Sequence, residues 1–285
     1  MKLHLPVQLF RAVIALMAVA MPFNASAEQK YTVADGQQLT LSGLDELDLD
    51  ISGYYVSSTS GSASGGAIYA TRTGSVTLEH YVSVLFNENY ATTTSSSSAY
   101  AYGGAIYSYS GAITLSGNEC VTFSDNYASS KASSSASGGA IYSESGAITL
   151  SGNESVTFSG NYAYSSDSSA NSGAIYSNSG DITLSGNGSV TFSGNCASSS
   201  ASTKVSYGGA IDSSSGSITL SGNESVTFSG NYASSYSSAD GGAIYSYSGA
   251  ITLSGNESVT FSGNYASSSS SANSGAIYSN SGDIT

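Results

Sequence analysis

The sequence predicts an all-β protein folded as a parallel β-helix, a β-solenoid with about one coil for each repeat of 33–36 residues. Two observations support this prediction. The block GGAIYSYSGAITLSGNESVTFSGNYA at 241–266 returns along the chain with small changes. Within each block, the segments GAIY, ITL and VTF alternate apolar and polar residues between Gly and Ser, a pattern typical of short strands.

The repeats keep a constant block and vary mainly in the spacer between blocks. Complete blocks of 26 residues occupy 103–128, 138–163, 172–197, 208–233 and 241–266, and the spacers between them contain 7–10 residues rich in Ser and Ala. A looser first block occupies 65–91. We expect the β-helix to span 65–285, truncated in mid-repeat, with coils starting near 65, 103, 138, 172, 208, 241 and 274.

Each block is expected to form one coil of three short strands, each paired with its counterpart about 4.8 Å along the axis. Identical residues then lie above one another, so Ile, Leu, Val and Phe form internal columns. One block alone buries too little apolar surface to offset the entropy of ordering its backbone, and neighbouring coils supply the rest. Disorder is the alternative for a Ser- and Gly-rich chain, but it does not explain why the apolar residues keep their spacing.

The first 27 residues are predicted to be a secretory signal peptide. Lys2 and Arg11 flank its start, AVIALMAVAM at 12–21 is apolar, and PFNASA ends in a small-x-small site with cleavage after Ala27. An N-terminal membrane anchor is the alternative, although the apolar run is short for a bilayer. Residues 28–64 are expected to form an N-terminal cap or the first strands.

Charge and cysteine content exclude several classes of protein. After cleavage the chain keeps 4 basic and 19 acidic residues, so its formal charge is 4 − 19 = −15. This balance argues against nucleic-acid partners and against attachment to anionic lipid. Cys120 and Cys196 lie two coils apart with a lateral offset, beyond disulfide reach, so both are predicted to be free thiols.

Two sets of Asn occupy equivalent turn positions in the successive blocks. We expect at least one set to form a ladder of side-chain amides, because Asn tolerates the left-handed turn conformation and its amide can bond the next coil. Solvent-exposed turn residues are the alternative. The sets are Asn118, Asn153, Asn187, Asn223 and Asn256, and Asn126, Asn161, Asn195, Asn231 and Asn264.

No catalytic, cofactor-binding or metal-binding residues are predicted, and the protein is not expected to be an enzyme. His80 is the only histidine after the signal peptide, and no acidic partner is marked out for it. A polysaccharide-degrading β-helix is a remote alternative, because such enzymes need clustered carboxylates that do not repeat. One turn position carries Glu that we expect to be solvated, with Ca²⁺ held between coils as the alternative. These residues are Glu119, Glu154, Glu224 and Glu257.

Tyrosine is the residue type that most suggests recognition, with 22 in the chain. Tyr combined with Ser and Gly is typical of adaptable binding surfaces. Two sets inside the blocks can instead stack as structural columns, one after GAI (Tyr107, Tyr142, Tyr176, Tyr245, Tyr278) and one after FxxN (Tyr90, Tyr127, Tyr162, Tyr232, Tyr265). The candidate binding surface is therefore assigned to the tyrosines of the spacers, namely Tyr100, Tyr102, Tyr164, Tyr207 and Tyr236.

The alternation of two tetrapeptides resembles a known family. GGAI occurs five times and SGAI twice, and the second tetrapeptide reads FNEN at 86–89, FSDN at 123–126 and FSGN from Phe158, Phe192, Phe228 and Phe261. Paired GGA[ILV] and FxxN repeats after a signal peptide resemble the polymorphic outer membrane protein repeats of chlamydial-type autotransporters. The resemblance covers residues 65–285.

The resemblance implies a fold, a location and a role. It implies a right-handed β-helix that is the passenger of an autotransporter, secreted and displayed at the cell outer membrane. It implies attachment to the outer membrane through a C-terminal β-barrel that is missing from this sequence, which we interpret as an incomplete chain because it stops in mid-repeat at Thr285. Its partners would be proteins or glycans on host or neighbouring cells, with no cofactor and no nucleic acid. A structural cell-surface or coat protein without a dedicated receptor is the alternative function.

Overall fold

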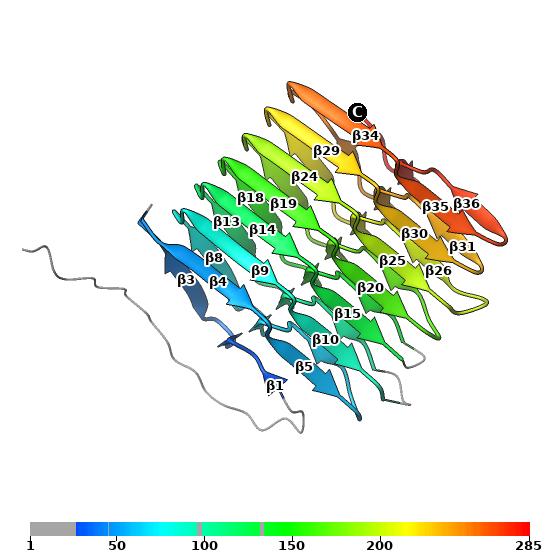
Figure 1. The fold of residues 1–285 in the computed structure, drawn as a ribbon, viewed down its shortest axis with the longest axis horizontal. Helices are drawn as coiled ribbons and strands as arrows, with labels where there is room; N and C mark the ends of the chain where they lie inside the picture. Colours follow the sequence, from blue (N-terminus) through cyan, green and yellow to red (C-terminus); the bar gives the residue numbers. More distant parts are fainter. Residues whose placement is uncertain (1–26, 45, 96–98, 132–133) are drawn as a thin grey trace, which may run out of the picture.

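The computed structural model describes residues 27–44, 46–95, 99–131 and 134–285, and this part of the chain is a parallel β-solenoid of about seven coils. Figure 1 shows the coils side by side in chain order, from blue to red. No helix is assigned in the described residues, so none there is long and apolar enough to cross a bilayer. The predicted signal peptide lies outside the described residues except for Ala27, which belongs to the short strand β1 (Ala27–Glu28).

Each coil contributes one strand to each of five sheets, rather than to the three expected. The predicted strands at GAIY, ITL and VTF are confirmed, and they form sheets 1, 2 and 3. The NYA end of each block and the following spacer form two more strands, in sheets 4 and 5. The pattern of three strands missed them because their inward side chains are Ala and Ser rather than large apolar residues.

Sheets 1 to 3 contain the predicted strands. Sheet 1 consists of β2 (Tyr31–Val33), β7 (Ile68–Ala70), β12 (Ile106–Ser108), β17 (Ile141–Ser143), β22 (Ile175–Ser177), β27 (Ile211–Ser213), β32 (Ile244–Ser246) and β37 (Ile277–Ser279). Sheet 2 consists of β3 (Gln38–Ser42), β8 (Ser75–Glu79), β13 (Ile113–Ser116), β18 (Ile148–Ser151), β23 (Ile182–Ser185), β28 (Ile218–Ser221) and β33 (Ile251–Thr252). Sheet 3 consists of β4 (Asp48–Ser52), β9 (Ser83–Asn87), β14 (Cys120–Ser124), β19 (Ser155–Ser159), β24 (Ser189–Ser193), β29 (Ser225–Ser229) and β34 (Ser258–Ser262).

Sheets 4 and 5 contain the additional strands. Sheet 4 consists of β1, which is antiparallel, followed by β5 (Tyr55–Ser58), β10 (Tyr90–Thr93), β15 (Tyr127–Ser130), β20 (Tyr162–Ser165), β25 (Cys196–Ser199), β30 (Tyr232–Ser235) and β35 (Tyr265–Ser268). Sheet 5 consists of β6 (Ala63–Ser64), β11 (Ala101–Tyr102), β16 (Ala136–Ser137), β21 (Ala170–Asn171), β26 (Val205–Tyr207), β31 (Ser238–Asp240) and β36 (Ser271–Asn273).

The solenoid begins before the first GGAI block. Within 28–64, strands β2 to β6 form a coil whose residues pair in register with those of the next, for example Leu39 with Val76. The following coil contains the looser first block.

The main core lies between sheets 1, 2 and 3, where like residues pair with like. Each block up to 208–233 buries its Ile, Leu, Val and Phe side chains, and consecutive Phe rings of sheet 3 stack with centroids 4.7–4.9 Å apart. Phe158 and Phe192 are 4.9 Å apart with their planes at 4°. The predicted stacking of successive blocks is confirmed.

Sheets 4 and 5 pack face to face and form a second, thinner pair of layers beside the main core, which we call the fin. Its small core contains Ala101 and Ala136 from sheet 5, and Ala128 and Ala163 from sheet 4. Because Ala carries only a methyl group, the backbones of the two sheets lie close together. The Ser/Ala spacers therefore contribute strands of their own.

Two glycines make the corner between the fin and sheet 1. Gly138 has φ +65°, in the left-handed region that favours glycine. At Gly139, a Cβ atom would lie 2.0 Å from the carbonyl oxygen of Gly173 in the next coil, so a side chain does not fit. The GG of each GGAI therefore turns the chain and lets neighbouring coils approach. Ser replaces the first glycine in two coils, at Ser172 with φ +53° and at Ser274 with φ +54°.

Both predicted Asn ladders are present and buried. At Asn161, Oδ1 accepts hydrogen bonds from the backbone N (3.1 Å) and Nδ2 (2.9 Å) of Asn126 in the preceding coil. Its own Nδ2 donates to Oδ1 of Asn195 (2.9 Å) and to the carbonyl of Phe123 (2.9 Å). All four bonding positions of the carboxamide are filled, so a polar group is buried without loss of hydrogen bonds. The set that contains Asn118 and Asn153 repeats the same pattern between sheets 2 and 3.

The cysteines are free, as predicted. Cys120 pairs in register with Ser155 in sheet 3, whereas Cys196 lies between Tyr162 and Tyr232 in sheet 4. Burial raises the pKa of the Cys196 thiol to about 12, which disfavours the reactive thiolate.

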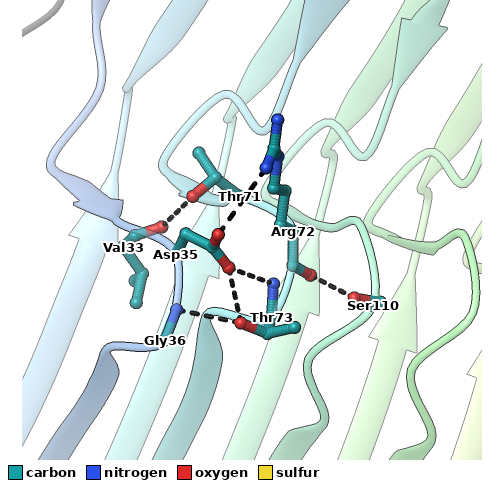
Figure 2. A network of polar contacts seen from close by, with 7 residues as sticks. All are labelled: Val33, Asp35, Gly36, Thr71, Arg72, Thr73 and Ser110. Atoms are coloured by element: carbon teal, nitrogen blue, oxygen red, sulfur yellow. Dashed lines mark hydrogen bonds and ion pairs between the residues drawn. The ribbon is translucent and has the colours of Figure 1, made fainter.

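The first turn between sheets 1 and 2 differs from the later ones (Figure 2). Later coils close this turn with a buried Ser whose hydroxyl donates to a Gly carbonyl, as Ser143 does to Gly146 at 2.6 Å. In the early turn, Asp35 accepts hydrogen bonds from the backbone N (3.3 Å) and hydroxyl (2.6 Å) of Thr73, and it lies 3.9 Å from Arg72. Contacts between Asp35 of one coil and Thr73 and Arg72 of the next thus take the place of the hydrogen bond from Ser to Gly within one turn.

The Asn161→Ala variant is expected to lose roughly 2–4 kcal/mol of stability, because it leaves several buried groups of Asn126, Asn195 and Phe123 without a partner. Urea denaturation followed by circular dichroism measures the midpoint. Asn280→Ala, at an exposed turn position, is the control and should leave the midpoint unchanged. Equal midpoints for the two variants would contradict a stabilising role for the ladder.

Candidate functional site

The tyrosines that follow GAI form a column on the outer side of sheet 1. In each strand the Ile side chain enters the main core, and the next residue points away from it. Consecutive rings stack with centroids 5.1–5.7 Å apart and planes within 8–23° of parallel. We call Tyr69, Tyr107, Tyr142, Tyr176, Tyr245 and Tyr278 the sheet 1 tyrosine column.

The sheet 1 tyrosine column is largely buried although it lies outside the main core. Tyr142 is only 3% exposed, because rings cover it on both sides and Tyr102 of the fin stacks on it at 4.2 Å. Its hydroxyl donates to the carboxylate of Glu144 in the adjacent turn. Burial, followed by the nearby Tyr102 and Glu144, holds the pKa of Tyr142 well above its usual value. The ring faces are used for packing, so this column is structural.

A second column lies on the outer face of sheet 4. Tyr127 and Tyr162 stack at 5.3 Å, and Tyr232 and Tyr265 at 5.1 Å. Cys196 interrupts the column between Tyr162 and Tyr232. Burial raises the pKa of Tyr162 to about 12. These rings are half-buried or exposed, so sheet 4 presents more aromatic surface than sheet 1 does.

The five candidate spacer tyrosines do not form one surface. Tyr100 and Tyr236 are exposed, at 40% and 61%. Tyr102 and Tyr207 are half-buried and stack against the sheet 1 tyrosine column, with Tyr207 at 4.5 Å from Tyr245. Tyr164 lies on the outer face of sheet 4, 6.0 Å from Tyr162. The spacers therefore supply both packing rings and exposed rings.

Two exposed tyrosines inside the blocks were not among the predicted residues. Tyr109 and Tyr247 lie at the turn between sheets 1 and 2 and are 51% and 56% exposed. The signal was present in the sequence, because the residue between the two Ser of the Y-S-x-S-G motif varies while its neighbours stay nearly constant. Successive coils place Tyr109, Glu144, Asn178, Ser214, Tyr247 and Asn280 at this position. A variable residue in a constant block indicates an outward side chain.

The described residues hold no group of three His, Cys, Asp or Glu that could bind a metal ion. The Glu column predicted at the turn between sheets 2 and 3 is exposed, at Glu119, Glu154, Glu224 and Glu257. His80 is also exposed. What the described residues offer for recognition is an array of tyrosines on a rigid frame.

Comparison with known families identifies the repeat. The model of the Chlamydia polymorphic membrane protein repeat matches the chain at three places, residues 83–109, 121–144 and 225–247. Each match runs from an FxxN-bearing segment toward or into the following GGAI segment. The suspected repeat family is therefore confirmed for these segments. No curated protein and no solved structure gave a significant match.

Alkaline pH should destabilise the fold through the sheet 1 tyrosine column. Because burial raises the pKa of Tyr107, Tyr142 and Tyr176 in the folded state, the unfolded chain loses these protons first, and the free energy of unfolding falls as pH rises above about 10. Urea midpoints measured at increasing pH, together with tyrosinate absorbance, test this expectation. Tyr142→Phe should lessen the alkaline loss, whereas the exposed Tyr109→Phe should not. Tyrosinate that forms without any change in stability would contradict it.

Proposed function

We propose that this chain, which carries the Chlamydia polymorphic membrane protein repeat, is a surface-displayed autotransporter passenger that binds other cells through exposed tyrosines on a rigid β-solenoid. The observation that carries the proposal is the division of the tyrosines into two populations. One population stacks in columns that stabilise the coils. The other, which includes Tyr109, Tyr236 and Tyr247, is exposed and has no packing role comparable to that of the columns.

Exposed tyrosines suit adhesion on physical grounds. A tyrosine ring offers a large contact area at a low cost in side-chain entropy, and its hydroxyl adds a hydrogen bond. Tyr109 and Tyr247 occupy the same turn position four coils apart, which corresponds to about 19 Å along the axis. Weak contacts repeated on one rigid body gain affinity by acting together.

The charge of the chain restricts the class of partner. The mature chain has a formal charge of 4 − 19 = −15, so most of its carboxylates have no basic side chain to pair with. A strongly acidic surface disfavours anionic partners such as sulfated glycans and nucleic acids. The proposed partners are neutral glycans or proteins with a neutral or basic surface on host or neighbouring cells.

The second candidate function is a structural surface or coat protein. The buried columns favour it, because most tyrosines inside the blocks are explained by packing between coils. A structural protein would not need the exposed tyrosines for its function. The cell-binding experiment below therefore distinguishes this alternative from adhesion.

Beads coated with residues 28–285 should bind cultured epithelial cells, and two double variants locate the contact surface. Tyr109→Ser with Tyr247→Ser changes the turn between sheets 1 and 2. Tyr100→Ser with Tyr236→Ser changes the connection between sheets 4 and 5. We expect at least one pair to lower cell binding by roughly tenfold, as removal of aromatic contacts typically does. Flow cytometry counts the cells that carry beads.

The matched control is Asn178→Ser with Asn280→Ser, which changes the same turn position in other coils. Circular dichroism of every variant checks that the fold is kept, because Tyr100 stacks on Tyr102 at 5.2 Å and Asn178 donates to Glu144 at 2.9 Å. Binding that survives both tyrosine pairs, or no binding by the parent, would contradict adhesion through these residues and favour the structural role.

A further inference from the structure

One ring is missing from the sheet 1 tyrosine column. In β27 the position that follows GAI is Asp212, which pairs in register with Tyr176 on one side and Tyr245 on the other. Adjacent rings elsewhere in the column are 5.1–5.7 Å apart. Replacing a phenol ring by the short carboxylate side chain leaves a ring-sized gap between two tyrosines.

A pocket of about 110 Å³ lies beside Asp212 and Tyr245. It is lined by Asn171, Tyr207, Asp212, Ser214, Tyr245 and Tyr247. The rings of Tyr207 and Tyr245 lie 4.5 Å apart and are tilted by 34°. Ser214 is held by Tyr176, with 2.9 Å between the two hydroxyl oxygens. The pocket is thus aromatic on one side and polar on the other.

The polar side contains two buried acceptors without a partner. These are Oδ1 of Asp212 and Oδ1 of Asn171, and they are the two unpartnered buried side-chain polar atoms in the described residues. Asp212 is 2% exposed. The amide of Asn171 donates through Nδ2 to the Ser137 hydroxyl (3.2 Å), which leaves its oxygen for the pocket. Buried acceptors without donors cost free energy, so the arrangement suits a ligand that brings N–H groups.

The charge around the pocket is negative. No Lys or Arg lines it. The pKa of Tyr245 is raised mainly by burial, then by Asp212 and Tyr207, and to a smaller extent by Asp240. Asp240 is also buried, so a second carboxyl group lies near the pocket. Burial raises the pKa of Asp212 itself well above its usual value, because no cation offsets the cost of an ionised carboxylate there. A bound cation would supply that compensation.

We propose that this pocket binds a protonated primary amine. The ammonium donates hydrogen bonds to Oδ1 of Asp212 and Oδ1 of Asn171, and the attached methylene groups pack on the rings of Tyr207 and Tyr245. An ammonium over tyrosine faces also gains a cation–π attraction. A quaternary ammonium has no N–H for the two acceptors, and a neutral alcohol brings neither the charge nor a second donor. The site does not depend on the proposed adhesion.

The amine has two possible sources, a free alkylammonium and the side chain of a lysine in another protein. Isothermal titration calorimetry of residues 28–285 compares n-butylammonium chloride with a short peptide that contains one internal lysine. Tetramethylammonium chloride and n-butanol, at the same ionic strength, test the need for N–H groups and for charge. Saturable binding of either amine at one site per chain supports the proposal, and the tighter of the two identifies the source.

Three variants locate the binding. Asp212→Asn removes the charge with little change in shape and should weaken amine binding by roughly 10- to 100-fold, the range for a lost charged hydrogen bond. Asp212→Tyr restores the ring found in the other coils, so it should fill the gap, abolish amine binding and raise the thermal midpoint. Asp167→Asn, at an exposed spacer carboxylate, removes the same charge elsewhere and should bind as the parent does.

The proposal is overturned if neither amine binds to the parent. It is also overturned if Asp212→Asn binds the amine as tightly as the parent and the control Asp167→Asn do. Equal binding of tetramethylammonium or n-butanol would also overturn it, because recognition would then rest on the aromatic wall alone. Circular dichroism of each variant shows that a loss of binding does not arise from unfolding.

Discussion

The fold depends on one constraint, the in-register parallel pairing of each coil with the next. This pairing places Phe on Phe, Ile on Ile and Asn on Asn, so most stacked contacts in the blocks are contacts between like side chains. For Phe the result is an uninterrupted stack of rings, and for Asn it is a chain of amides with every donor and acceptor used. A shift by one residue would turn the apolar side chains outward, and the buried amides would lose their partners. Although the repeats are nearly identical, these two costs keep the coils in a single register.

Most of the main core could be predicted from the sequence, because its strands alternate large apolar and polar residues at constant spacing. The fin could not be predicted in the same way. Its inward residues, such as Ala128 and Ala136, are too small to mark a strand face, and the spacers that form it vary in length and look like low-complexity sequence. The structure shows that small side chains are sufficient when two sheets already lie close together.

Prediction of the tyrosine surface was partly successful for a related reason. Composition identifies tyrosine as the residue of interest but does not separate rings that pack from rings that face solvent. Tyr102 and Tyr207 belong to spacers yet stack on the column of sheet 1, whereas Tyr109 belongs to a block and is exposed. The residues that break the repeat, Cys196 and Asp212, are visible in the sequence. The coordinates add that Asp212 lines a pocket together with Asn171 and Tyr207.

The Asn ladders also give the solenoid a direction. Between the Asn side chains, the backbone N and Nδ2 of one coil donate to Oδ1 of the Asn in the coil that follows it in the sequence. The same Nδ2 also donates to a backbone carbonyl of the preceding coil, as that of Asn161 does to Phe123. The two faces of a coil are therefore unlike at this corner: Asn161 presents Oδ1 and one side-chain N–H to the preceding coil, and its backbone N–H and the other side-chain N–H to the following coil. An inverted coil would bring the backbone N–H and side-chain N–H of its Asn against the same two groups of its neighbour, so the ladder favours one orientation. The Asn ladders thus favour head-to-tail stacking of the coils, and one Asn side chain at each of two corners contributes to this preference.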